Sequence, residues 1–253
     1  MRKTAISILT LGLIAASFAT ATAGSLMTEP FTYADGGLVA NSGGNWTTHS
    51  GAGTDIAITG NFITGSSANA PDDNRLFGPR STTDKTYACF RVRIPQTAAA
   101  ITAANYFAHF MINTTTFRSK VFIAPSGSTF TLGLTVTANA AGTPAAIPAA
   151  NTWGTALNFD QWYTVAISYD AAAGTSEMWI DPASELSTKI TVTEAGTGGG
   201  ALTAFGFRES AVAGAAFTYN ADDLSVGTTF ADACGGATPT RGSSWGGVKT
   251  IYR

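Results

Sequence analysis

Apolar and polar residues alternate most regularly between residues 162 and 182, where two runs flank a short turn of small residues. A period of two is expected for a strand with one buried face. If Asp170 pairs with Thr175, then Ile167 falls opposite Met178, and apolar side chains face one another along the whole hairpin. The glycine before the second run suits the left-handed position that closes such a turn. The pattern predicts a β-hairpin around which the chain is organised.

Short apolar runs separated by turn residues recur through the rest of the chain. No segment longer than about 10 residues carries a helical repeat, and about a dozen short strands are expected in all. The clearest strands are expected at 86–94, 105–112, 120–125, 129–137, 202–210 and 217–227. Weaker ones are expected at 55–60, 61–65, 75–77 and 187–192. This pattern predicts an all-β chain, arranged as a sandwich or a barrel.

Two of these stretches carry further information. Residues 105–112 are apolar on both faces, which is typical of a strand in the middle of a sandwich sheet. In 217–227 the apolar parity changes, which predicts a β-bulge near Asn220–Asp222. Residues 138–160 contain three candidate breakers of regular structure, Gly142, Pro144 and Pro148, and we expect a loop there.

The first 23 residues have the pattern of an export signal: two basic residues, an apolar run, and small residues ending at Ala23. The alternative is a membrane-anchoring helix, but about 15 apolar residues fall short of the roughly 20 that a span needs. We therefore expect cleavage after Ala23, an extracellular or cell-surface location, and one domain at 24–235. No later stretch has the length and apolarity of a membrane span.

Residues 236–253 are expected to form a linker and a short C-terminal tail. Aromatic and apolar residues from Trp245 onward fall at helical spacing, with basic residues near the end. The tail is either a sorting or docking signal, or a segment folded back on the domain.

The charge of the chain is low and slightly acidic. Lys and Arg number 14 against 16 Asp and Glu, and removing residues 1–23 changes the formal charge from −2 to −4. A weakly acidic chain without a basic cluster lacks the electrostatic footprint of a nucleic-acid binder. Nothing in it favours an anionic membrane surface.

The two cysteines, Cys89 and Cys234, would meet an oxidising environment after export. Cys89 shares a strand face with Tyr87, Arg91 and Arg93 rather than with the apolar face. We therefore expect a Cys89–Cys234 disulfide, with two free thiols as the alternative. No cofactor is expected, and two cysteines and two histidines without ligand spacing do not indicate a metal site. A calcium ion held by loop carboxylates is an alternative, but no spacing of acidic residues requires one.

Several motifs together resemble a known superfamily. They are Glu-Pro-Phe-x-Tyr at 29–33, Gly-Gly-x-Trp at 43–46, Met-Trp-Ile-Asp-Pro at 178–182, Phe-Gly-Phe-Arg at 205–208 and Asp-Asp-Leu-Ser-Val-Gly-Thr-Thr-Phe-Ala-Asp at 222–232. In this order they resemble exported bacterial proteins of the concanavalin A-like lectin/glucanase superfamily, over about residues 29–233. Phe230 stands where that superfamily usually has Trp, and we expect it to keep the packing role. The resemblance implies a two-sheet antiparallel β-sandwich of the laminin G-like jelly-roll type. Because the motifs are mostly packing motifs, it implies a fold more than an activity.

Glucanases of this superfamily hydrolyse with two carboxylates about 5–5.5 Å apart. Glu177 and Asp181 are four residues apart on one strand, which separates them by about 13 Å. Asp222 and Asp223 would point to opposite faces of a regular strand, and Asp72 and Asp73 fall in an expected loop. No pair suited to glycoside hydrolysis is therefore found.

The two histidines do not suggest catalysis by themselves. His109 lies on the strand that is apolar on both faces, and we expect it to be an interior residue with hydrogen bonds. His49 lies in a Thr-Ser-Gly stretch expected to be a loop. Neither accompanies a nucleophile motif.

The leading hypothesis is an exported, non-catalytic module that binds a polysaccharide or another cell-surface polymer. The alternatives are a structural protein of the cell surface or matrix, and a glycan-cleaving enzyme of the same fold. Trp179 is the candidate binding platform, with Glu177, Asp181 and Thr164 beside it, because an indole suits the apolar face of a sugar ring. The alternative is a packed Trp179, in which case the ligand site belongs to the loops at 66–84 and 138–160.

Overall fold

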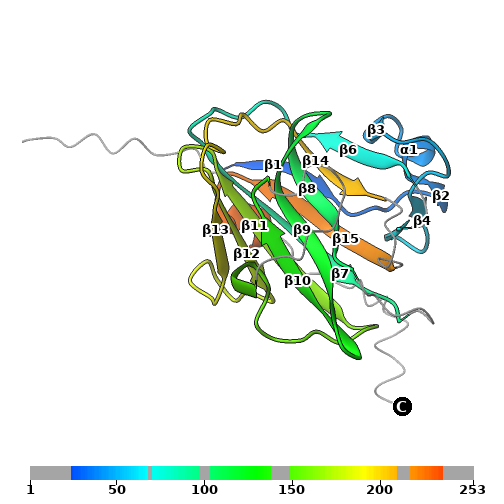
Figure 1. Ribbon diagram of the computed structural model, residues 1–253. Helices are drawn as coiled ribbons and strands as arrows, with labels where there is room; N and C mark the ends of the chain where they lie inside the picture. Colours follow the sequence, from blue (N-terminus) through cyan, green and yellow to red (C-terminus); the bar gives the residue numbers. More distant parts are fainter. Residues whose placement is uncertain (1–23, 68–69, 97–102, 138–148, 210–216, 236–253) are drawn as a thin grey trace, which may run out of the picture.

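Two antiparallel β-sheets packed face to face form the protein in its computed structural model, which describes residues 24–67, 70–96, 103–137, 149–209 and 217–235 (Figure 1). The strands of the larger sheet are β1 (Ser25–Glu29), β2 (Gly36–Gly37), β4 (Ala57–Ile58), β5 (Ile63–Ser66), β7 (Lys85–Arg93), β11 (Trp162–Asp170), β12 (Thr175–Ile180), β13 (Ile190–Thr193) and β15 (Thr218–Gly227). The strands of the smaller sheet are β3 (Thr47–Ser50), β6 (Asp72–Leu76), β8 (Asn105–Asn113), β9 (Thr116–Ser126), β10 (Thr129–Thr135) and β14 (Ala204–Arg208). The helical segments are α1 (Leu38–Asn41), η1 (Ala149–Asn151) and α2 (Phe230–Cys234).

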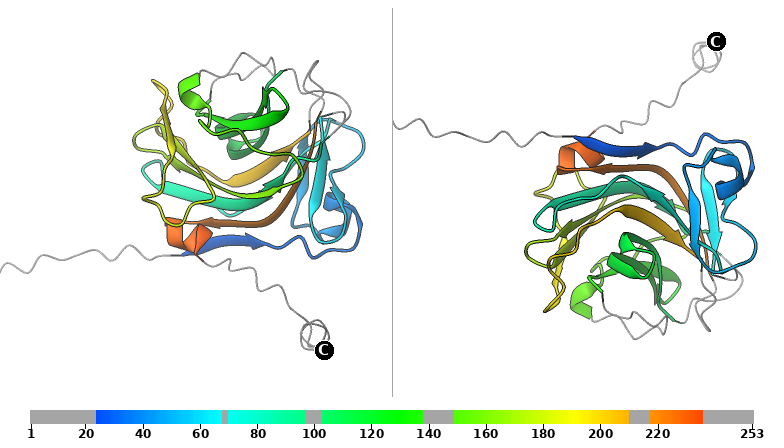
Figure 2. Two further views of the ribbon diagram at one scale, coloured as in Figure 1. Left: turned by 90° about the horizontal axis from the view of Figure 1, so that it is seen from below. Right: turned by 90° about the horizontal axis from the view of Figure 1, so that it is seen from above.

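The larger sheet has the order β13-β12-β11-β7-β15-β5-β4-β2, with β1 beside β15, and the smaller one the order β10-β9-β8-β14-β6-β3. Both sheets are curved, and α2 lies against the outer side of the larger one (Figure 2). The expected all-β, two-sheet antiparallel sandwich is confirmed. No helix in the described ranges is long and apolar enough to cross a membrane.

The central hairpin has the register that the apolar pattern predicts. Asp170 pairs with Thr175 and Ile167 with Met178. Gly174 has a φ of 65°, the left-handed conformation that the turn requires. Both parts of the prediction are confirmed.

The bulge expected in the last strand is also present. The pairing of β15 with β7 shifts between Asp222 and Ser225, and Asp223 has a φ of 51°. As a result, Asp222 and Asp223 both reach Arg91, at 3.7 and 3.5 Å. The expectation that they face opposite sides was wrong, because it assumed a regular strand.

Aromatic rings from both sheets fill the space between them. Phe90 of the larger sheet contacts Phe205 and Phe207 of the smaller one at centroid distances of 5.7 and 5.9 Å, and Phe107 contacts Tyr219 at 5.1 Å. All five are buried. Because the inner faces are closed by these contacts, ligand chemistry has to come from the outer faces or the rims.

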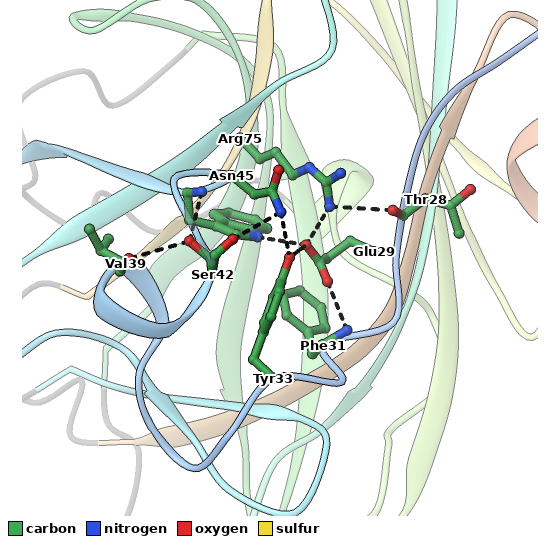
Figure 3. A network of polar contacts seen from close by, with 9 residues as sticks. Thr28, Glu29, Phe31, Tyr33, Val39, Ser42, Asn45 and Arg75 are labelled. Atoms are coloured by element: carbon green, nitrogen blue, oxygen red, sulfur yellow. Dashed lines mark hydrogen bonds and ion pairs between the residues drawn. The ribbon is translucent and has the colours of Figure 1, made fainter.

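A buried carboxylate holds the N-terminal segment (Figure 3). Glu29 accepts hydrogen bonds from the backbone N–H of Phe31 at 2.8 Å, the hydroxyl of Tyr33 at 2.7 Å and the indole of Trp46 at 2.9 Å, and it forms an ion pair with Arg75. These residues include those of the Glu-Pro-Phe-x-Tyr and Gly-Gly-x-Trp motifs. Those motifs therefore serve packing, as the resemblance implied.

The chain before the central hairpin is less irregular than expected. Residues 149–151 form η1, and single bridges join Phe130 to Leu157 and Gly133 to Thr152, so this segment extends the free edge of β10. Residues 138–148 of the expected loop lie outside the described residues. So do the expected export signal at 1–23 and the C-terminal tail at 236–253.

Candidate ligand-binding site

Trp179, the platform expected from the sequence, is fully buried at 0% exposure. Its ring packs against Phe230 of α2 at a centroid distance of 5.4 Å and against Tyr87 at 6.4 Å. Lys189 lies over the ring at 5.1 Å, and the indole N–H donates to the carbonyl of Glu185 at 3.1 Å. No face of the indole is free for a sugar, so its role is corrected to packing between the sheet and α2. Phe230 keeps the packing role expected for it.

The residues expected to flank the platform also have structural partners. Glu177 forms ion pairs with Lys85 at 2.6 Å and Lys189 at 2.5 Å. Burial alone would raise the pKa of Glu177, but the hydrogen bonds from the two lysines outweigh it and lower the pKa. The Asp181 carboxylate accepts from the backbone N–H of Thr164 at 2.7 Å and so closes the end of the hairpin.

Cys89 of β7 and Cys234, the last residue of α2, lie where this helix packs on the larger sheet. Cys89 is in the same buried cluster as Trp179, on the outer face of the larger sheet, and Cys234 packs against that cluster. This confirms that Cys89 is outside the main core. Both thiols are free in the structure, and the contact with Cys89, together with burial, raises the pKa of Cys234. The two side chains are in the same cluster, and the Cys89–Cys234 disulfide stays a prediction.

The protein's only two histidines meet on the outer face of the smaller sheet. His109 of β8 is fully buried, and its ring lies 4.3 Å from Phe117 of β9, 5.6 Å from Tyr106 and 5.9 Å from His49 of β3. His49 is in a strand rather than the expected loop. Sheet pairing has brought together two imidazoles that are 60 positions apart in the sequence.

A bulge between β8 and β9 creates this arrangement. Ala108 pairs with Val121 and Phe110 with Arg118, so His109 alone faces both Ser119 and Lys120. Ser119 has a φ of 49°, a left-handed conformation that costs energy for a residue with a side chain. Because of this extra residue, Phe117 and Lys120 reach the same outer face. Bulges and strained residues of this kind are frequent beside ligand and catalytic sites.

The environment keeps both imidazoles neutral. Burial lowers the pKa of His49 to about 4, and a hydrogen bond with the side chain of Asn74 acts in the opposite direction. Burial also lowers the pKa of His109 well below its usual value, and the charges of Arg208 and Lys120 add to this effect. In the described part of the chain, no hydrogen-bond partner is found for either ring nitrogen of His109. The expected burial of His109 is confirmed, but its expected hydrogen bonds are not found.

Unpaired polar atoms in a protein interior are costly, at about 1–3 kcal/mol each. The two unpaired nitrogens of the fully buried His109 are therefore unusual for a purely structural site. A neutral imidazole has one N–H donor and one acceptor nitrogen, which is the pairing that a sugar hydroxyl needs. At Gly206 of β14, a β-carbon would lie 3.0 Å from Nε2 of His109, so the missing side chain leaves room for this ring.

Two cations share one aromatic ring beside the histidines. The guanidinium of Arg208 lies 4.1 Å above Tyr106, and the ammonium of Lys120 lies 4.9 Å from the centroid of that ring. Arg208 also donates to Asn105 at 2.9 Å and lies 3.7 Å from Asp72. Burial raises the pKa of Asp72 to about 7, and Arg208 only partly offsets this. Near neutral pH this carboxyl group is therefore protonated in a large fraction of molecules.

A hollow of about 100 Å³ lies beside this cluster. Its walls come from the start of β9 and the end of β10, and they combine an aromatic ring, two cations and three hydroxyl groups: Thr115, Thr116, Phe117, Arg118, Lys120 and Thr137. We call the hollow, together with His49, Tyr106, His109 and Arg208, the β9 site. An aromatic wall with a few converging polar groups is the usual composition of a small-ligand site.

The sequence did not single out the β9 site. Asp72, which lies beside Arg208 of this site, is in the 66–84 stretch that was the second choice, but the members of the site were not considered as a group. The Arg-Ser-Lys triplet at the start of β9 was a usable signal, because three polar residues interrupt an otherwise apolar strand. Among the described residues, no group of three or more His, Cys, Asp or Glu side chains could hold a metal ion.

A second aromatic surface lies on the other side of the sandwich. The half-buried Trp162 lies under Arg91 and Arg93, whose guanidinium carbons are 4.8 and 5.3 Å from the ring centroid, and Phe62 meets it edge-on at 5.9 Å. Of the two tryptophans on this face of the hairpin, Trp162 is the more exposed. The two arginines beside Trp162 have side-chain partners of their own: Arg91 pairs with Asp222 and Asp223, and Arg93 donates to Asn220. Trp162 is therefore a suitable control position for the β9 site.

Comparison with known proteins agrees with the fold. No protein-family model and no curated protein matches the chain. Among solved structures, the CBM2 module of the Lactobacillus casei BL23 phage J-1 evolved Dit matches 81% of this chain and 96% of its own, with a TM-score of 0.51 and 11% identity. A sialidase (TM-score 0.48, 11% identity) matches 81% of this chain, which spans 19% of the sialidase. Basic winged bean lectin with Tn-antigen (TM-score 0.42, 12% identity) matches 72% of this chain and 92% of the lectin.

At these identities the likeness concerns the fold alone. The fold, two antiparallel β-sheets packed as a sandwich, agrees with the architecture that the sequence motifs implied.

Proposed function

We propose that the protein binds a carbohydrate polymer at the β9 site. The observation that carries the proposal is the fully buried, neutral His109, whose two ring nitrogens meet no described partner, together with the neutral, half-buried His49, set between aromatic rings and beside a hollow. Hydroxyl groups of a sugar would supply the missing hydrogen bonds, and Phe117 would pack against an apolar ring face. The solved structures of similar fold include a carbohydrate-binding module and a lectin, which supports this ligand class.

The site proposed here replaces the one first expected at Trp179, because the indole of Trp179 is enclosed while the ring nitrogens of His109 lack partners among the described residues. The location outside the cell and the presence of the export signal are part of the proposal. They rest on the pattern of residues 1–23.

A second candidate is a glycan-cleaving enzyme acting at the same site. It is favoured by the grouping of perturbed acids and bases: Asp72 with a pKa of about 7, Lys120 with a pKa of about 8, and two neutral imidazoles. Such groups can accept or donate protons near neutral pH. The grouping does not fit the paired carboxylates of a retaining glycosidase.

The test is a screen of residues 24–253 against soluble polysaccharides by affinity electrophoresis and calorimetry. We expect at least one polymer to bind, and His109→Asn to weaken that binding by about tenfold while the protein stays folded. Trp162→Ala, on the other sheet, is the matched control and should leave the affinity unchanged.

If Trp162→Ala abolishes binding and His109→Asn does not, the ligand site is on the larger sheet and the location is wrong. If no polymer binds, the function is wrong. Release of new chain ends during incubation would favour the enzyme over the binding module.

A further inference from the structure

The charges around the hollow point to the chemistry of the ligand. Lys120 is only 2% exposed, and its ammonium group donates to the carbonyl of Thr137 at 3.1 Å. Arg118 donates to the hydroxyl of Tyr169 at 3.2 Å and to the backbone carbonyls of Thr197 and Phe117. All of these acceptors are neutral. Among the described residues, no carboxylate oxygen lies within 4.0 Å of either cation.

Buried charges in proteins are usually paired, because removing an ion from water is costly. Other cations of this protein follow that rule: Arg75 pairs with Glu29, and Lys189 with Glu177. Among the described residues, Lys120, Arg118 and Arg93 form no ion pair with a carboxylate, and of these the buried Lys120 and the half-buried Arg118 line the hollow. An anionic group that enters the hollow would compensate both charges.

The surroundings of Lys120 are positive on balance. Burial lowers its pKa to about 8, and the charges of Arg208 on β14 and Arg118 on its own strand act in the same direction. Glu194 acts in the opposite direction, but its carboxylate also accepts hydrogen bonds from the backbone N–H groups of Val136 and Thr137. From β8, the ring of Tyr106 and the neutral His109 face the ammonium group and bring no negative charge near pH 7.

We propose that the hollow receives an anionic group of an acidic polysaccharide, either a uronic acid carboxylate or a sulfate ester. The proposal rests on the proposed function and names the class of sugar that the β9 site selects. Lys120 and Arg118 compensate the charge, and the threonine hydroxyls at the rim donate to the remaining anionic oxygens. The sugar ring that carries the group lies against Phe117, with its neighbouring hydroxyls toward the histidines.

The experiment compares three oligosaccharides of equal length by calorimetry: oligogalacturonate, sulfated dextran oligomer and neutral dextran oligomer. We expect one or both acidic oligomers to bind at least tenfold more tightly than the neutral one. The two acidic arms tell a carboxylate site from a sulfate site. The preference should weaken as the pH rises through about 8, since Lys120 then loses its proton.

Single-residue variants test whether the ammonium group of Lys120 causes the preference for acidic oligomers. Lys120→Met keeps most of the buried stem and removes the ammonium group, so it should abolish the preference, while Lys120→Arg should restore at least part of it. Arg91→Gln, on the opposite sheet, is the control for a general loss of positive charge and should change nothing. Thermal melting shows that each variant is folded.

Equal affinity for neutral and acidic oligomers would overturn the inference and leave the proposed function intact. So would an acidic preference that survives in a folded Lys120→Met variant. If none of the oligomers binds, and the wider screen also finds no ligand, both the inference and the proposed function are overturned.

Discussion

Replacing Trp179 by alanine tests whether this residue packs or binds. The indole is fully buried between the larger sheet and α2, so its removal leaves a cavity rather than an exposed patch. Truncating a buried tryptophan typically costs about 3–5 kcal/mol, and the hydrogen bond to Glu185 adds about 1 kcal/mol at most. We expect a loss of about 4 kcal/mol in the free energy of unfolding. For a domain of this size the melting temperature should fall by about 8–16 °C.

The measurement is urea unfolding followed by circular dichroism. The midpoint should fall while the slope with denaturant stays constant, since the cavity changes stability and not the surface exposed on unfolding. Trp162→Ala is the matched control. Trp162 is half-buried and mainly stacks with two guanidinium groups, so its loss should cost about 1 kcal/mol.

Two results would refute this reasoning. One is a Trp179→Ala variant that loses less than about 1 kcal/mol. The other is a Trp179→Ala variant that keeps its stability but loses glycan binding, which would return the binding platform to this residue.

Three further predictions concern other parts of the molecule. The exported protein should contain a Cys89–Cys234 disulfide, which on the chain-entropy model stabilises by at most about 4–5 kcal/mol; an intact mass without reductant checks it, and two alkylatable thiols would contradict it. Glu29→Gln should cost about 2–3 kcal/mol in urea unfolding, less than for a fully buried pair because Arg75 keeps 22% exposure; an unchanged midpoint would show that the network is not stabilising. Asp72→Asn should become more stable relative to wild type as the pH rises from about 4 to about 7, because over this range the carboxyl group ionises in unfolded wild type but keeps its proton in the folded state, where its pKa is raised to about 7, so that wild type loses stability; a pH-independent difference would contradict this.

The sequence predicted what depends on neighbouring positions. The hairpin register followed from alternation on both sides of one turn, and the bulge in β15 followed from a parity change within one strand. The outward position of Cys89 followed from the residues on either side of it. Each of these inferences needed fewer than about 20 consecutive residues.

What the sequence could not predict depends on the order of strands in the sheets. His49 on β3 and His109 on β8 belong to the same sheet, with β6 and β14 between their strands, and their rings meet in the folded structure. No local pattern encodes this strand order, so the sequence could not show that the two rings are close. Alternation likewise identified the face that carries Trp179 but could not show that α2 covers it, since α2 lies about 50 residues further along the chain. The site was therefore first expected on the wrong face.

The most direct test of the central claim uses the protein's only two histidines as reporters. The imidazole signals of His49 and His109 are followed by NMR while a polysaccharide fragment that binds in the screen is added. Binding at the β9 site predicts that both sets of ring signals shift in a saturable way, while the indole signals of Trp162 and Trp179 stay in place. Imidazole signals that stay fixed at saturation, with shifts at either indole instead, would contradict the account.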